Sequence, residues 1–226
     1  MSDITSIELK DIDPEDISDV LLKVEESFGF KFGKTELKDV KYFGELCDII
    51  TQKVQGDNSN DCTTQQAFYK VRSSIADTVR VDTNSITPDT DLEKLFPRYN
   101  RRHQILATEK LLGFKIRVLR PKHWIMIALV LITFSSLVSL AFYWQLGLAG
   151  VLFSIIGFKL VDKFGNELDL QTVGQLAEKI ARENYLKSRR NPATVNRNEI
   201  VKKIEDLFRT DLDLEDSELN RQSAFV

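Results

Sequence analysis

Histidine and cysteine supply many of the bases, nucleophiles and transition-metal ligands of proteins, and each occurs twice among the 226 residues. His103 lies in a basic segment, and His123 stands 20 residues further on, directly before a long apolar run. Cys47 falls on the apolar face of a predicted helix and is expected to be a small core residue. Together with Cys62 it forms neither a disulfide framework nor a metal-ligand motif. We therefore predict neither a catalytic site nor a metal site.

Carboxylate pairs could act as general acid and base, but their contexts favour ordinary surface positions. Glu25–Glu26 is predicted on a solvated helix face, and Asp89–Asp91 in a capped loop. The sequence has no phosphate-binding loop and no glycine-rich dinucleotide turn. The basic stretch 98–122 lacks the stacking pattern of a nucleic-acid-binding sheet, so no nucleic acid is expected. The chain is predicted to be a non-enzyme without a cofactor.

Charge is distributed unevenly along the chain, although the net charge is only −3. Residues 1–66 hold 15 acidic and 7 basic side chains, a net of −8. Residues 98–122 hold 8 basic side chains and one acid, a net of +7. The basic block precedes the apolar run, and Lys159 and Lys163 follow it. Positive flanks on both sides are typical of a membrane hairpin whose two ends face the cytoplasm.

The apolar run is the element around which this charge is arranged. Trp124–Phe158 contains 35 residues and no charge. One continuous helix of that length would extend for about 52 Å, against a hydrocarbon layer of roughly 30 Å. We therefore predict two legs joined by a turn at 143–147, the second leg being short, at residues 146–161. The alternatives are one long tilted or re-entrant span and a buried hairpin of a soluble domain.

Small and aromatic residues support the hairpin interpretation. Serines on the first leg and glycines on the second offer close packing, and aromatic residues at both ends of the first leg suit membrane–water interfaces. No ionisable group lies within the run, so no ion or proton path is expected. The small residues are Ser135, Ser136, Ser139, Gly147, Gly150, Ser154 and Gly157. The residues expected at the membrane surface are Arg117, Arg120, Lys122, Trp124, Lys159 and Lys163.

Outside the run, apolar residues recur with the helical period of 3.6 and predict an all-α chain. Helices are predicted from Pro14 to Phe28, at 43–54, at 64–79, from Asn100 to Leu112, after Thr172 and at 198–209. Stretches near 56–63 and 186–194 are predicted linkers, residues 162–170 are predicted to form a turn, and no strand is expected.

These helices resemble the four-helix fold of acyl carrier proteins. Val24–Phe32 followed by Tyr42–Ile50 is similar to the end of that family's second helix running through to its fourth. Residues 67–116 give a second match, to helices I and II, and the fourth-helix pattern of that unit comes only at Thr172–Ile180. The resemblance implies that the membrane hairpin is inserted within the second carrier-like unit.

The resemblance also implies where a phosphopantetheine group would be attached in a working carrier. That position, a serine at the start of helix II, corresponds here to Pro14 in the first unit and Arg98 in the second, and neither can be modified. Ser18 and Ser217 are the nearest serines outside the expected position. The chain is therefore expected to be a degenerate carrier that holds no phosphopantetheine, with modification of an unorthodox serine as the alternative.

Carriers bind their enzymes through an acidic helix II, and the resemblance implies docking surfaces here. The first unit keeps Glu15, Asp16 and Asp19, and the second inverts the charge; the candidate docking residues are Glu15, Asp16, Asp19, Arg98, Arg101 and Arg102. The alternative for the basic set is a solvated run that obeys the positive-inside rule. The C-terminal helix resembles carrier helix I, and either completes the bundle of residues 14–54 or stands alone.

The fold class predicted from these observations is all-α: short-helix, acyl-carrier-like bundles plus a transmembrane helical hairpin. The predicted segments are a partial carrier-like unit (1–55), a linker (56–63), helices I–II of a second unit (64–123), the hairpin (124–161), the remainder of that unit (162–186), and a linker with the C-terminal helix (187–226).

The expected function is a membrane-anchored, non-catalytic docking or scaffold module of the cell (inner) membrane, multi-pass, with both termini cytoplasmic. Its expected partners are the lipid bilayer and a protein of acyl-chain or lipid metabolism, the latter implied by the resemblance alone. The alternatives are a true acyl carrier and a small membrane-assembly subunit.

Overall fold

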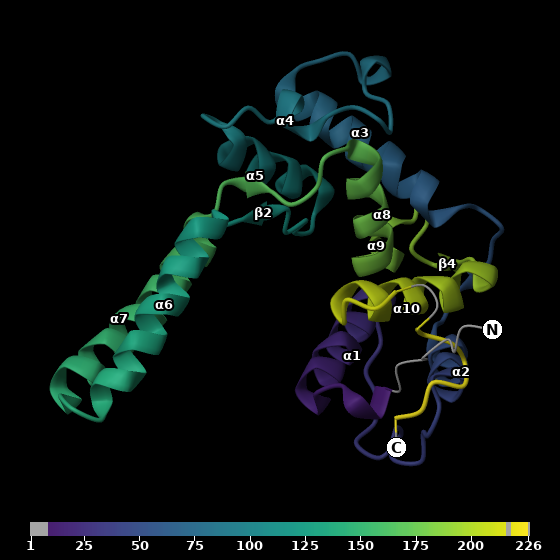
Figure 1. Ribbon diagram of the computed structural model, residues 1–226. Helices are drawn as coiled ribbons and strands as arrows, with labels where there is room; N and C mark the ends of the chain where they lie inside the picture. Colours follow the sequence, from purple (N-terminus) through teal and green to yellow (C-terminus); the bar gives the residue numbers. More distant parts are fainter. Residues whose placement is uncertain (1–8, 216–217, 226) are drawn as a thin grey trace, which may run out of the picture. The chain divides into compact units, whose positions relative to one another are not determined.

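The computed structural model describes residues 9–215 and 218–225, and it is mainly helical, in agreement with the predicted all-α class (Figure 1). Within these residues the α-helices are α1 (Pro14–Phe28), α2 (Phe43–Lys53), α3 (Thr63–Val79), α4 (Leu92–Leu95), α5 (Arg101–Leu112), α6 (His123–Leu140), α7 (Trp144–Phe164), α8 (Val173–Glu183), α9 (Tyr185–Ser188) and α10 (Arg197–Asp211). Short 3₁₀ turns lie at Leu9–Asp11 and Thr83–Ser85.

Four two-residue strands were not predicted. They are β1 (Asp57–Asn58), β2 (Leu119–Arg120), β3 (Glu167–Leu168) and β4 (Thr194–Val195). β1 pairs with β4 in parallel, and β2 pairs with β3 antiparallel. Each pair joins segments that are distant in sequence and too short to show an alternating apolar pattern, which explains why the sequence does not reveal them.

The chain divides into two compact units. Unit 1 contains residues up to Ser73 and residues from Gly174 onward, and unit 2 contains Ser74–Val173. The hairpin therefore belongs to unit 2, whereas unit 1 is built from both ends of the chain.

The core of unit 1 joins α1 and α2 to α10, so of the two alternatives for the C-terminal helix the structure has the one in which it packs on residues 14–54. Phe43 of α2 and Phe208 of α10 are fully buried, with ring centroids 5.0 Å apart in an edge-to-face arrangement. The ring centroids of Phe28 in α1 and Tyr185 in α9 lie 4.9 Å apart. The buried apolar residues of this core are Leu9, Val20, Val24, Phe28, Phe43, Leu46, Cys47, Ile50, Val54, Tyr185, Val195, Ile200, Ile204, Leu207, Phe208 and Leu219.

α1 has the predicted bounds, and local signals fix both of its ends. The Asp13 side chain accepts a hydrogen bond from the Glu15 backbone N–H at 2.9 Å, and Pro14 occupies the first helical turn. Gly29 ends the helix in the left-handed conformation, with φ of 69°, and its N–H donates to the Glu25 carbonyl. Glycine adopts this conformation without the steric cost of a Cβ atom, which explains the sharp stop.

The segments predicted as linkers in unit 1 are ordered by a buried arginine. Arg189 is fully buried, and its guanidinium donates to the Thr63 hydroxyl at 2.7 Å and to the Asp61 carbonyl at 3.3 Å. The Lys70 ammonium donates to the Arg189 carbonyl at 2.6 Å. Side-chain hydrogen bonds and the β1–β4 pair thus connect residues 57–63 to residues 185–195.

Unit 2 forms a second, smaller core at the base of the hairpin. Buried apolar side chains come from the end of α3, the following loop, α4, α5 and the segment before β2: Ile75, Ile86, Leu92, Phe96, Ile105, Ile116 and Val118. The Leu92 N–H donates to the Gln171 carbonyl at 2.8 Å, and the Val173 N–H to the Thr90 carbonyl at 3.0 Å. The chain segment that follows the hairpin therefore returns to the part that precedes it.

Candidate membrane interface

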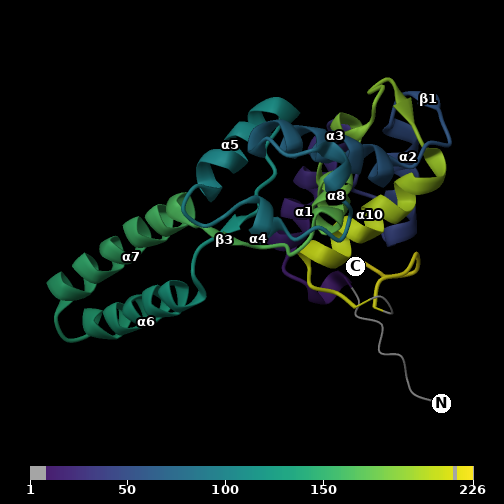
Figure 2. The same ribbon diagram turned by 90° about the horizontal axis from the view of Figure 1, so that it is seen from above.

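The two legs of the apolar run are α6 and α7, which lie side by side (Figures 1 and 2). This excludes one continuous helix and confirms that the run is divided into two legs, but the turn lies at residues 141–143 rather than at 143–147, because α7 already begins at Trp144. Both helices are long and apolar enough to cross a membrane, with mean hydropathies of 2.0 and 1.6 over 18 residues. Only 11% of each of these segments is buried, so they are not core helices of this chain.

The second leg is longer than predicted. α7 runs from Trp144 to Phe164, 21 residues, instead of 146–161. At ~1.5 Å per residue the whole helix is about 31 Å long and its 18-residue apolar span, Trp144–Val161, about 27 Å, which is close to a hydrocarbon layer of roughly 30 Å. The predicted leg already contained Lys159; the helix exceeds it at both ends, beginning at Trp144 and continuing through Lys163, whereas the apolar span within it ends at Val161 as predicted. Long lysine side chains can extend toward an aqueous interface while their backbone stays helical.

Most of the predicted small residues form the seam between the two helices: Ser136 and Ser154 are buried and the three glycines face the opposite helix, whereas Ser135 is exposed. A Cβ atom added to Gly147 would lie 2.7 Å from the backbone N of Leu140, and one added to Gly157 would lie 2.7 Å from Leu129 Cδ2. A Cβ atom on Gly150 would meet the Ser136 side chain at distances that real atoms do not adopt. The glycines thus allow the close approach of the two backbones that small residues give to membrane helices.

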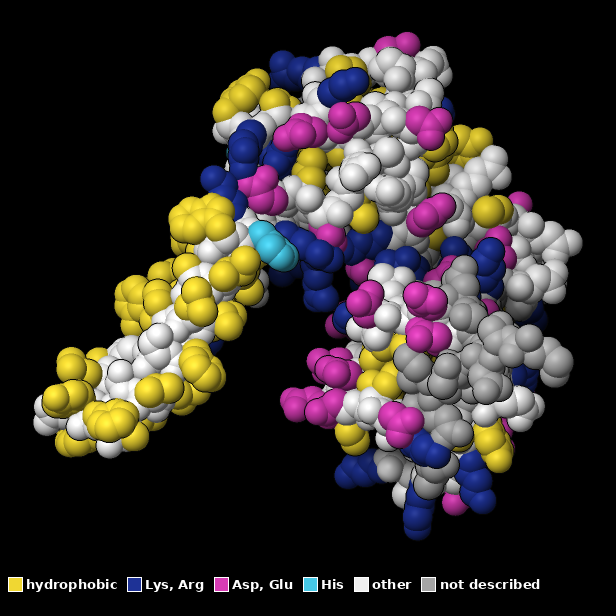
Figure 3. Space-filling view, in the orientation of Figure 1, with side chains coloured by type: hydrophobic (Ala, Val, Ile, Leu, Met, Phe, Trp, Pro, Cys, Tyr) yellow, Lys and Arg dark blue, Asp and Glu magenta, His cyan; other side chains and the backbone are white. Residues whose placement is uncertain are grey.

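The outer faces of the hairpin are covered with exposed apolar side chains (Figure 3). An apolar surface of this extent marks a site of interaction, because soluble monomers rarely expose one. The exposed large residues are Trp124, Ile127, Val130, Leu131, Ile132, Phe134, Leu137, Val138, Leu140, Phe142, Tyr143, Trp144, Leu146, Leu148, Leu152, Phe153, Ile155, Ile156, Leu160 and Phe164.

Aromatic side chains mark both ends of the hairpin. Trp124, 65% exposed, stands at the start of α6. Phe142, Tyr143 and Trp144 are exposed at the turn. Amphipathic aromatic rings are enriched at membrane–water interfaces, so this distribution suits a segment that reaches from one interface to the other.

The base of the hairpin is closed by backbone pairing. Leu119 and Arg120 of β2 pair with Leu168 and Glu167 of β3, and a Cβ atom on Gly165 would lie 2.7 Å from the Arg120 backbone. The two ends of the hairpin therefore emerge next to each other.

The predicted membrane-surface residues lie near this base. Lys122 precedes α6, Trp124 lies in its first turn, and Lys159 and Lys163 lie in the last turns of α7. All four are exposed. Arg117 is exposed with φ of 42°, and Arg120 pairs with Asp169 at 2.7 Å. The hairpin thus carries a cationic base and an apolar stem.

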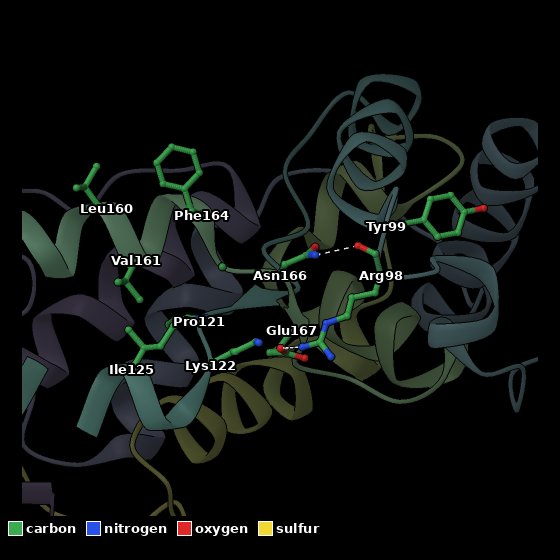
Figure 4. A pocket seen from close by; sticks show the side chains of 11 residues that line it. Arg98, Tyr99, Pro121, Lys122, Ile125, Leu160, Val161, Phe164, Asn166 and Glu167 are labelled. Atoms are coloured by element: carbon green, nitrogen blue, oxygen red, sulfur yellow. Dashed lines mark hydrogen bonds and ion pairs between the residues drawn. The ribbon is translucent and has the colours of Figure 1, made fainter. Parts of the chain in front are cut away.

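A cavity of about 650 Å³ lies at this base (Figure 4). Its wall on the hairpin is apolar, and its other end is polar, with an ion pair between Arg98 and Glu167. The Asn166 amide donates to the Arg98 carbonyl at 2.9 Å. The lining residues are Arg98, Tyr99, Pro121, Lys122, Ile125, Leu160, Val161, Phe164, Gly165, Asn166 and Glu167.

The three basic residues predicted for docking in unit 2 have different roles. Arg98 is 54% exposed at its side chain and lines the cavity. Arg102 is half-buried, with its guanidinium 5.4 Å from the centre of the Phe164 ring. Arg101 is only 1% exposed, so an exposed docking role for it is wrong.

Arg101 instead holds unit 2 together. Its guanidinium donates to the Phe96 carbonyl at 2.8 Å, to the Asn166 carbonyl at 2.8 Å and to the Glu93 carboxylate at 3.0 Å. The charge pattern alone does not show which of the neighbouring arginines is internal. The helical period could have identified it, because Arg101 lies four residues before the buried Ile105 on the same face of α5.

The acidic candidates of unit 1 are available at the surface. Glu15, Asp16 and Asp19 are exposed on α1. Pro14, at the position that the carrier resemblance assigns to the modified serine, lies in the first turn of this helix. The Ser18 hydroxyl donates to the Pro14 carbonyl at 2.8 Å, and Ser217 lies outside the described residues.

Several titratable groups of unit 1 have environments that shift their pKa values. Burial raises the pKa of the Cys47 thiol to about 12, which fits a core residue, whereas Cys62 is exposed. Burial opposes ionisation of Glu25, but hydrogen bonds from the Phe32 N–H and the Lys31 ammonium hold its pKa below the ordinary value. No group of three or more His, Cys, Asp or Glu side chains among the described residues could hold a metal ion.

Comparison of the chain with models of protein families, with curated proteins and with solved structures finds no match.

Proposed function

We propose that this chain is a membrane-anchored, non-catalytic helical adaptor, held in the bilayer by the α6–α7 hairpin and presenting unit 1 to a protein partner on the cytoplasmic face. The observation that carries the proposal is the hairpin itself: two helices of membrane-spanning length, apolar on their outer faces and close-packed through glycines along their seam. A soluble protein would leave this surface in contact with water, at a cost that rises with the apolar area.

The base of the hairpin supports the same reading. Because β2 and β3 pair with each other, both ends of the hairpin return to one side, as two complete crossings require. The exposed Lys122, Lys159 and Lys163 at that side favour the cytoplasmic face under the positive-inside rule. Both ends of the chain would then be cytoplasmic.

The proposed partner class follows from the resemblance to acyl carrier proteins. The exposed Glu15, Asp16 and Asp19 would meet a basic surface, as the acidic helix of a carrier does. An enzyme of acyl-chain or lipid metabolism is therefore the proposed partner class. Ser18 lies one turn inside α1 rather than at its start, which does not favour the alternative of a true carrier.

Extraction of membranes at alkaline pH tests the anchoring proposal. The full chain should stay in the membrane pellet, and Leu131→Lys, in the middle of α6, should reduce membrane integration because a lysine at the centre of a span costs about 2.5–3.5 kcal/mol. Leu22→Lys is the matched control, since Leu22 is similarly exposed, 55% against 61%, but lies on α1. Release of the wild-type chain into the supernatant would refute the anchor.

Reporters of sidedness test the orientation. A reporter inserted after residue 60 and another at the C-terminus should both be cytoplasmic, and opposite sides would exclude the hairpin arrangement.

Incubation with a phosphopantetheinyl transferase and coenzyme A tests the adaptor against the alternative of a true acyl carrier. The adaptor should gain no mass, whereas a phosphopantetheine adduct on Ser18 or Ser217 would make the chain a true carrier.

A further inference from the structure

The cavity at the base of the hairpin has the two-part character of a lipid site. One wall consists of Ile125 from α6 with Leu160, Val161 and Phe164 from α7. The opposite end carries charged and amide groups (Figure 4). Pockets of roughly 300–1,000 Å³ commonly hold small ligands, and this one, at about 650 Å³, lies in that range.

The charges around the cavity favour an anionic ligand. Arg98 is already paired with Glu167, the one acid among the lining residues that the structure describes. The Lys122 carbonyl accepts from the N–H groups of Ile125 and Met126, but its side-chain ammonium has no hydrogen-bond or ion-pair partner within the described part of the chain, so it supplies an uncompensated positive charge. Arg102, which stacks on Phe164, adds a further cation beside the apolar wall.

The position of the cavity identifies the kind of molecule. Its apolar wall continues directly into the outer faces of α6 and α7, and its polar end lies where these helices begin and end. If the hairpin crosses a bilayer, as proposed above, this is the depth of phospholipid headgroups. A free anion would use only the polar end, whereas a phospholipid would occupy both parts.

We propose that this cavity binds one acidic phospholipid. Its phosphate would pair with the Lys122 ammonium, and the first part of an acyl chain would lie against Ile125, Leu160 and Phe164. This inference rests on the proposed membrane function, and it adds a specific lipid site to the general attraction between basic residues and anionic membranes.

Native mass spectrometry of the full chain, purified in mild detergent, tests the proposal. The probes are phosphatidylglycerol and phosphatidylcholine with identical acyl chains. The wild-type protein should retain one phosphatidylglycerol molecule in preference to phosphatidylcholine, and an excess of glycerol phosphate should not displace it. Equal retention of the two lipids, or displacement by glycerol phosphate, would overturn the proposal.

Two lysine variants distinguish a defined phospholipid site in the cavity from general electrostatic attraction between basic residues and anionic lipids. Lys122→Glu should lower the occupancy of phosphatidylglycerol about tenfold, as expected for the loss of one charge-assisted hydrogen bond. Lys159→Glu makes the same change in charge at an exposed residue of α7 that does not line the cavity, and it should have a much smaller effect. Equal losses in the two variants would refute a defined site.

Alkaline extraction of the same variants separates the two proposals. Lys122→Glu should remain in the membrane pellet, because the hairpin is unchanged. A wild-type chain that stays in the pellet but retains no acidic lipid would overturn the lipid site alone. A wild-type chain that leaves the membrane would overturn the anchor itself and the lipid site with it.

Discussion

Leu207→Ala in α10 tests whether both ends of the chain form one cooperative unit. Leu207 is fully buried in the core shared by α1, α2 and α10. The substitution removes three carbon groups at about 0.8 kcal/mol each, or roughly 2.4 kcal/mol, and the residual cavity raises the cost to about 3 kcal/mol. Leu22→Ala in α1 is the matched control; since Leu22 is 55% exposed, it should cost about 1 kcal/mol or less.

Amide hydrogen exchange measures this effect segment by segment. A loss of about 3 kcal/mol should raise the exchange rates of the best-protected amides in α1 and α2 roughly 150-fold, although the altered residue lies more than 150 positions away in sequence from either helix. If only α10 exchanges faster while α1 and α2 keep their protection, the shared core is refuted. In that case the C-terminal helix would be an independent appendage.

Four further outcomes are expected. In the folded chain a disulfide reagent at neutral pH should modify Cys62 rapidly and Cys47 only on unfolding, because the pKa of the buried thiol is raised to about 12; two equally fast thiols would contradict this. Gly150→Leu should weaken association of α6 and α7, by about 1–3 kcal/mol from overpacking, seen as a lower melting temperature in detergent. Arg101→Leu should destabilise unit 2 by about 3 kcal/mol in a denaturant titration, since three acceptors lose their donor. Hydrogen bonds from the Lys41 and Tyr42 N–H groups lower the pKa of Glu45 from 4.5, so the ionised carboxylate stabilises unit 1 above pH 4.5 and this stabilisation is lost as the pH falls through the lowered pKa. In Glu45→Gln the free energy of unfolding of unit 1 should therefore fall less steeply over this acidic range.

Much of the helical framework follows from local signals in the sequence. The capping aspartate Asp13, the proline after it and Gly29 define α1 to the residue. Asn196 caps α10 through its side chain, which accepts a hydrogen bond from the Asn198 N–H at 3.1 Å. Helix ends of this kind depend on neighbours within four residues, and so they can be predicted from one sequence.

Contacts between distant segments are harder to predict. Arg101 and Arg189 each occur in a basic stretch that suggests solvent or lipid headgroups, yet both are fully buried. Their burial depends on carbonyl groups supplied by remote segments, such as Asn166 for the first and Asp61 for the second. The cavity at the hairpin base depends in the same way on elements about 40 to 70 residues apart.

The construction of unit 1 from both ends of the chain has a consequence for biosynthesis. Residues 14–54 leave the ribosome before α10, and their core lacks Ile200, Ile204 and Phe208 until about 150 further residues have been made. At roughly 5–20 residues per second, this delay lasts about 8–30 s. The apolar hairpin emerges within that interval, so its insertion would precede the closure of unit 1. During this time the apolar faces of α1 and α2 remain uncovered, which makes the nascent chain a candidate client for a chaperone.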